Sequence, residues 1–121
     1  LVRLEPDIPA EYGTPIVEFS VKGRALNEDA SPVENIEVTA VNLHQTVRTA
    51  ADGTFHISGE MIGFEMTDIT LGFEDTDGEN NGGEFEDSTM VIKLVKTDSG
   101  DGIWDNGDYQ AENVEVILKK K

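Results

Sequence analysis

Hydrophobic and polar residues alternate along most of this chain, and the alternation is broken into short blocks. From Ile16 to Leu26, Val17, Phe19 and Val21 fall on one side of an extended backbone, and polar or charged residues fall on the other. A period of two is typical of a strand with one buried face. The alternation returns from Ile36 to Leu43, where the second half is apolar on both faces and indicates a more central strand.

Further strands are predicted wherever the alternation returns between turn residues. Asp52 and Gly53 predict a tight turn, because glycine adopts a positive φ at little cost. Gly59 to Gly63 is expected to be a loop or a single helical turn, and Lys96 to Asp108 an acidic, glycine-rich loop. The remaining predicted strands are Thr46 to Thr49, Thr54 to Ser58, Met66 to Phe73, Ser88 to Val95 and Tyr109 to Leu118.

About seven short strands separated by turn signals predict an all-β fold. We expect an antiparallel β-sandwich of the Ig-like or transthyretin-like type over residues 16–118. Residues 1–15 contain three prolines and are expected to form an N-terminal tether. Residues 119–121 are all lysine and are expected to form a frayed, basic C-terminal end.

The net charge of the chain limits the classes of partner that can be expected. With 121 residues it has the length of one domain, and its 9 basic and 25 acidic residues give a net charge of −16. Nucleic acid and anionic membrane surfaces repel such a chain, so neither is expected as a partner, whereas cations are attracted. The absence of cysteine excludes disulfides, thiolate metal sites and thiol catalysis.

Export is an expectation from the chain's first residue. The sequence begins at Leu1 and not at Met, so we expect that an upstream segment such as a signal peptide has been removed. No apolar run approaches the roughly 18–20 residues that a membrane span needs.

The stretch from Glu74 to Asp87 is the strongest candidate for chemistry. Seven of its fourteen side chains are carboxylates, and Ca²⁺ prefers oxygen ligands of this kind. The flanking segments are predicted strands, so this is not an EF-hand, and a solvated hairpin loop without metal is the alternative. The predicted Ca²⁺ ligands are Asp75, Asp77, Glu79, Asn81, Glu84 and Glu86.

Aromatic residues and histidines offer weaker signals. Trp104 and Tyr109 are predicted to form a stacking platform for a sugar or a protein partner, and the alternative for Trp104 is that it caps the core. His56 alternates outward on its strand and is expected at the surface, so no zinc site is predicted. No catalytic residue is predicted, and a small hydrolase using loop carboxylates is a further alternative.

The segment from Val21 to Ser58 resembles the carboxypeptidase-regulatory-like, or transthyretin-like, β-sandwich modules. Asn35 stands where that family usually has glycine, and Ala25 where it usually has valine; neither change is expected to endanger the fold. The positions that match the family pattern are Val21, Gly23, Pro32, Ile36, Val38, Thr49, Asp52, Gly53 and Phe55.

The whole chain also resembles the lipoproteins of Bacteroidetes that are associated with radical SAM enzymes. The shared features are EYGTP after a short tether, then VKG, DTDGENNGGEF and GDGIWDNGDY. The resemblance implies export to the cell envelope or outer membrane, with a lipid anchor on a cysteine upstream of Leu1. It records a genomic association and implies no activity.

These signals together predict a non-enzymatic, exported module of the cell envelope. It is expected to bind an unknown protein or glycan partner or to act as a spacer, with Ca²⁺ as the one cofactor considered. The rival predictions are the carbohydrate-binding module, the small hydrolase and a substrate of an associated modifying enzyme.

Overall fold

The computed structural model describes residues 15–41, 43–63, 65–77, 83–98, 100 and 105–121. This part of the chain contains no helix, and so no helix in it could cross a membrane. The predicted β-sandwich is confirmed, with eight strands in place of about seven. The strands are β1 (Ile16–Leu26), β2 (Ile36–Ala40), β3 (Gln45–Arg48), β4 (Thr54–Ile62), β5 (Asp68–Asp75), β6 (Ser88–Lys93), β7 (Val95–Asp98) and β8 (Asp105–Ile117).

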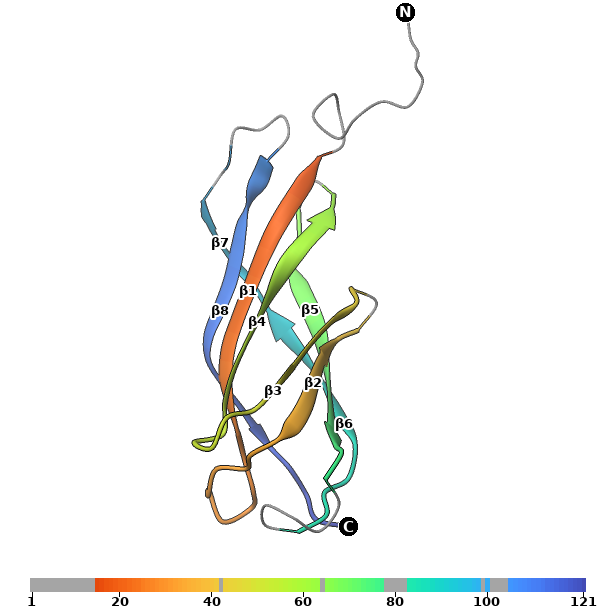
Figure 1. The fold of residues 1–121 in the computed structure, drawn as a ribbon. Coiled ribbons are helices and arrows are strands. Elements are labelled where there is room, and N and C mark those ends of the chain that lie inside the picture. The colour runs from red at the N-terminus through yellow and green to blue at the C-terminus, as the bar shows by residue number, and fades with distance from the viewer. Residues whose placement is uncertain (1–14, 42, 64, 78–82, 99, 101–104) are drawn as a thin grey trace, which may run out of the picture.

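Two four-stranded sheets pack face to face, with the strand orders β4-β1-β8-β7 and β3-β2-β5-β6 (Figure 1). Neighbouring strands are antiparallel with one exception, because β1 and β8 run parallel. The chain changes sheet after β1, β3, β4 and β6. β1 and β8 lie side by side along the long axis and make the sandwich elongated (Figure 1).

Two segments predicted as loops are strands in the structure. β4 continues through Gly59 to Ile62, because the first half of β1 pairs with it as far as Ile16 opposite Ile62. In the predicted loop from Lys96 to Asp108, the first three residues belong to β7 (Val95–Asp98) and the last four to β8. β7 pairs with residues 108–110 of β8. In both cases the partner strand stabilises an extended conformation that the local sequence does not favour.

The core consists of the inward-facing residues of both sheets, as the two-residue period predicts. Val17 and Val21 of β1, Val38 of β2 and Leu71 of β5 are fully buried, as expected for the inward-facing positions of paired strands. The rings of Phe55 and Phe73 meet edge to face across the two sheets, with centroids 5.8 Å apart and planes at 71°. The other buried apolar residues of this core are Phe19, Ala25, Val33, Ile36, Ala40, Ile57, Met66, Ile69, Phe85, Ile92, Tyr109, Val116 and Leu118.

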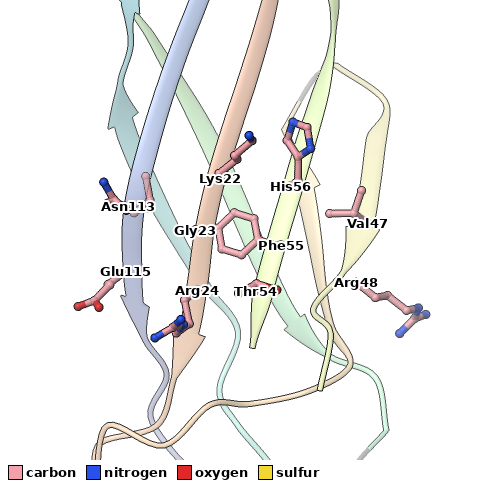
Figure 2. Close-up of a pocket in the computed structure, with 11 residues that line it drawn as sticks. Lys22, Gly23, Arg24, Val47, Arg48, Thr54, Phe55, His56, Asn113 and Glu115 are labelled. Atoms are coloured by element: carbon pink, nitrogen blue, oxygen red, sulfur yellow. The ribbon is translucent and has the colours of Figure 1, made fainter. Parts of the chain in front are cut away.

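Phe55 lies beside a glycine on the neighbouring strand. Gly23 of β1 pairs directly with Phe55 of β4, and the ring lies next to the backbone of β1 (Figure 2). A Cβ atom at Gly23 would lie 2.6 Å from the Val114 carbonyl oxygen and 2.7 Å from Phe55 Cζ. Only a residue without a side chain therefore allows β1, β4 and β8 to pack at this level.

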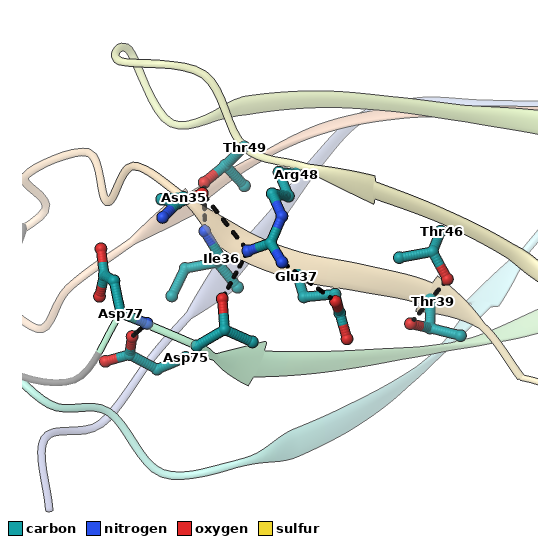
Figure 3. Close-up of polar contacts among 10 residues, drawn as sticks. Asn35, Ile36, Glu37, Thr39, Thr46, Arg48, Thr49, Asp75 and Asp77 are labelled. Carbon is teal, nitrogen blue, oxygen red and sulfur yellow. Dashed lines mark hydrogen bonds and ion pairs between the residues drawn. The ribbon is translucent and has the colours of Figure 1, made fainter.

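A buried threonine fixes the connections between the sheets (Figure 3). The hydroxyl of Thr49 donates to the Val33 carbonyl over 2.8 Å and accepts from the Ile36 amide over 2.9 Å. The backbone of Thr49 makes two further hydrogen bonds of 3.0 Å: its amide donates to the Ile36 carbonyl, and the Thr49 carbonyl accepts from the Asn35 amide. The segment entering β2 is thereby tied to the segment leaving β3, and the buried polar group is fully satisfied.

The turn after Thr49 needs the conformational freedom of glycine. Gly53 has a φ of 80°; its amide donates to the Ala50 carbonyl and its carbonyl accepts from the Ala25 amide, each over 2.8 Å. Asn35 also has a positive φ, of 64°, which asparagine tolerates better than other side chains. This position therefore suits asparagine or glycine and disfavours most other side chains.

We expect Gly23→Ala to lower the free energy of unfolding by about 1–3 kcal/mol, because the new methyl group overpacks the contact with Phe55 and Val114. Gly72→Ala is the matched control within a strand, since its nearest neighbour would be Val41 Cγ2 at 3.7 Å. Urea unfolding of both variants measures the difference. Equal stability of the two variants would contradict the packing described for Gly23.

Candidate functional site

The acidic loop between β5 and β6 is closed at its base by Asp75, the last residue of β5. Its Oδ1 accepts a hydrogen bond from the Asp77 amide over 3.1 Å, and its Oδ2 accepts one from the Phe85 amide over 3.0 Å. Phe85 is 2% exposed and plugs the end of the core. Asp75 therefore joins the outgoing and returning arms of the loop, in addition to any role toward a cation.

The returning arm of the loop pairs with the C-terminal residues. Backbone hydrogen bonds of 2.8 and 2.9 Å and an isolated β-bridge join residues 84–86 to residues 119–121. The Lys121 ammonium also lies 3.6 Å from Glu84 Oε2. The prediction of a frayed C-terminal end is wrong, because burial of Phe85 brings this arm alongside the chain end and opposite charges meet there.

The six predicted Ca²⁺ ligands divide between described and undescribed residues. Four lie at this end of the sandwich, namely Asp75, Asp77, Glu84 and Glu86, and Glu79 and Asn81 lie outside the described residues. Among the residues that the structure describes, no three His, Cys, Asp or Glu side chains are grouped closely enough to hold a metal ion. Ca²⁺ binding by this loop stays a prediction.

The environment of Asp75 disfavours its negative charge. Partial burial raises the pKa of the Asp75 carboxyl, and the neighbouring carboxyl of Asp77 raises it further by hydrogen bonding and like charge. Asp52, in the turn before β4, behaves in the opposite way. The hydroxyl of Thr54 donates to Asp52 Oδ1 over 2.6 Å and its amide over 3.1 Å, and these bonds lower the pKa of Asp52.

Arg48 of β3 supplies positive charge at the base of the acidic loop (Figure 3). Its guanidinium donates to the Thr76 hydroxyl, lies 3.4 Å from Asn35 Oδ1 and pairs with Glu37 Oε2 over 3.4 Å. These contacts connect β3, the entry to β2 and the end of β5. Sequence reasoning missed this network because it depends on the register of three strands, and a lone arginine on a short strand gives no signal of it.

A groove of about 530 Å³ lies over sheet β4-β1-β8-β7 and was also missed (Figure 2). Lys22 and Arg24 project from β1, and His56 of β4 stands directly opposite Lys22. The available signal was the outward position of these basic residues in an acidic chain, but their juxtaposition requires the register. The residues lining the groove are Lys22, Gly23, Arg24, Val47, Arg48, Thr54, Phe55, His56, Asn113, Val114 and Glu115.

His56 also contacts a hydroxyl at the edge of this groove. Its Nε2 lies 2.8 Å from Ser20 Oγ, and the pair is exposed, which confirms the predicted surface position of His56. A nucleophilic serine needs a base that a third group orients. No carboxylate among the described residues hydrogen-bonds to His56, so the pair matches an ordinary surface hydrogen bond. The hydrolase alternative, which relies on loop carboxylates, stays a prediction.

The predicted stacking platform is only partly described. Tyr109 of β8 is 5% exposed and belongs to the core, and the Lys96 ammonium lies 5.8 Å from the centre of its ring. This burial favours a structural role for Tyr109 over an open stacking surface. Trp104 lies outside the described residues.

Comparison with known proteins adds no family to these observations. No protein-family model matches the chain, and no curated protein gives a significant match. The function is therefore inferred from the residues, from the structure and from the resemblance that the sequence carries.

The opposite pKa shifts predict opposite pH dependence for two variants. Folding raises the pKa of Asp75 above its value in the unfolded chain, which is near 3.8. The protonated carboxyl therefore stabilises the fold below pH 3.8, and this stabilisation is lost as the pH rises through the pKa of the folded state. Folding lowers the pKa of Asp52 below 3.8. Its ionised carboxylate therefore stabilises the fold above pH 3.8, and this stabilisation is lost as the pH falls through the pKa of the folded state. The advantage of wild type over Asp75→Asn should therefore shrink with rising pH, and its advantage over Asp52→Asn should grow.

Urea unfolding of the wild type and both variants from about pH 3 to pH 7 measures these differences, since this range spans the ordinary titration of aspartate. The two variants serve as controls for each other, because both replace a carboxyl by an amide, one at the end of β5 and one in the turn before β4. The same pH slope in both would contradict the environments described.

Proposed function

We propose that this chain is a non-enzymatic β-sandwich module of the cell envelope, held by a lipid anchor upstream of Leu1, that binds a partner or acts as a spacer. The family resemblance motivates the anchor and the export. Among the described residues, no carboxylate orients the histidine of the Ser20–His56 pair, which favours a role without catalysis.

The course of the chain through the sandwich is the observation that supports this proposal. β1 begins at Ile16 at one end, and Lys121 lies at the other end (Figure 1). β1 has 11 residues, so it alone spans about 36 Å at roughly 3.3 Å per residue. An anchor attached before Ile16 would hold the Lys121 end far from the membrane surface, as a spacer or a displayed binding module requires.

Fractionation of the native host tests the proposal. We expect the full-length, epitope-tagged precursor to appear in the membrane fraction, to resist extraction by high salt and to be released by detergent. It should also incorporate a clickable fatty acid, and replacement of the upstream lipid-acceptor cysteine by alanine should remove both the label and the membrane association. Recovery of the unaltered precursor from the cytosol, without label, would contradict the proposal.

Ca²⁺ binding at the acidic loop is the second candidate function. Asp75 and Asp77 are held together by the hydrogen bond between the Asp77 amide and Asp75 Oδ1, and the like charge of Asp77 raises the pKa of Asp75. A divalent cation would relieve this repulsion between the two carboxylates.

If the loop binds Ca²⁺, the ion at 100 times its dissociation constant should stabilise the fold by about 2.7 kcal/mol. For a chain of this size we expect the melting temperature to rise by roughly 10 °C between EDTA and millimolar Ca²⁺. Asp77→Asn should abolish the shift, and Asp52→Asn, which lies in another turn, should keep it. A melting temperature that Ca²⁺ leaves unchanged rules out a site of useful affinity.

A further inference from the structure

β7 covers only the first part of β8. The two strands pair at Val95 with Gln110, Lys96 with Tyr109, and Asp98 with Asp108, whereas β8 continues beside β1 as far as Ile117. Figure 1 shows β7 beside one half of β8 only. Within the described ranges, no strand pairs with residues 111–117 on the side away from β1. The backbone groups on that side therefore form an open sheet edge.

A second groove, of about 670 Å³, follows this open edge. Consecutive residues 110–115 of β8 line one side, and consecutive residues 90–93 of β6 line the other. A sheet face presents alternate residues, so lining by consecutive residues means that the strand edges border the groove. β6 is the outermost strand of the opposite sheet, and the groove is thus an opening along the side of the sandwich between two strand edges.

Apolar side chains stand at this opening. Val91 of β6 is 61% exposed and Val95 of β7 is 66% exposed, while Met90 and Val114 pack partly against the core. The irregularity at Asn113, which has a φ of 60°, interrupts β8, but residues 114–117 pair regularly with β1 below it. Residues 114–117 are therefore extended, and Val114 and Glu115 line the groove together with Val91 and Val95, as an added strand would need.

Charge decides which occupant suits the groove. Glu112 and Glu115 line it and are exposed, and Lys93 is the one basic residue among its lining residues. A second copy of the chain would bring the same carboxylates and another net charge of −16 to the edge, which is unfavourable. An extended segment with lysine or arginine between apolar residues complements both the carboxylates and the valines.

We propose that the β8 edge and the groove beside β6 bind an extended, basic peptide segment of a partner protein, which adds as a strand to sheet β4-β1-β8-β7. Main-chain hydrogen bonds to residues 114–117 provide affinity, and apolar side chains of the segment pack on Val91 and Val95. This inference rests on the binding role proposed above and names its surface and the chemistry of its partner.

A fluorescent probe peptide, acetyl-Lys-Val-Thr-Val-Lys-Val-Thr-Lys-amide, tests the proposal by anisotropy at about 0.15 M salt, where exposed charges are screened beyond about 8 Å. We expect saturable binding and at least about tenfold slower hydrogen exchange of amides within residues 111–117. The same peptide with proline in place of its central valine should not bind, because proline cannot complete a ladder.

Matched variants separate the groove from general electrostatic attraction. Val91→Lys and Val95→Lys should each weaken binding by about tenfold or more, since both put a like charge against the basic peptide. Ile62→Lys is the control, because Ile62 is 69% exposed on β4, at the opposite edge of the same sheet, and its change adds the same charge. It should leave the affinity within about twofold. Thermal unfolding verifies that all three variants fold.

Three results would overturn the proposal: no binding at millimolar peptide, equal weakening in Val91→Lys and Ile62→Lys, or equal binding of the proline peptide. Each would remove the groove as a strand-addition site. None would touch the proposed anchored module, because that proposal is judged by the fractionation and lipid labelling of the full-length precursor.

Discussion

The buried hydroxyl of Thr49 is the interaction on which the arrangement of the two sheets depends. It hydrogen-bonds to the Val33 carbonyl and the Ile36 amide, where the chain enters β2, and Thr49 itself directly follows β3, where the chain leaves the same sheet. An unsatisfied polar group at this depth would cost about 1–3 kcal/mol, so the segment that enters β2 and the segment that leaves β3 hold each other in a single geometry. The turn at Gly53 follows from this fixed point and hydrogen-bonds to Ala25, at the end of β1.

The packing of the core continues from that turn. Two residues after Gly53, Phe55 faces Gly23 across the pair β1 and β4, and its ring then meets Phe73 of the opposite sheet. The Phe55 ring occupies the space that a side chain at position 23 would fill, and this packing sets how closely β1, β4 and β8 approach one another. The apolar side chains of this core are closed off from solvent, so the groups available to a ligand lie on loops, strand edges and the outer faces of the sheets.

The sequence predicted those parts of the structure that depend on local pattern. β1 begins and ends at the predicted residues, and the inward positions of the paired strands follow the two-residue period. The extension of β4, the strand β7 and the pairing of residues 119–121 depend on partners distant in the sequence, so local composition indicated loops or a free end. Similarly, Asp75 was selected for its carboxylate, but its bond to the Phe85 amide requires knowledge of where the chain returns.

The negative net charge of this chain affects what can pair with the open edge of β8. An edge such as β8, with Val91 and Val95 beside it, is the kind of surface through which soluble domains associate with their own copies. Here each copy of the chain has a net charge of −16, and Glu112 and Glu115 lie at the edge itself. Repulsion between copies acts before backbone groups come within hydrogen-bonding distance, because the screening length of about 8 Å exceeds that distance. Among the residues that the structure describes, no strand covers this edge. The acidity of the chain therefore protects it from other copies and leaves it accessible to oppositely charged chains.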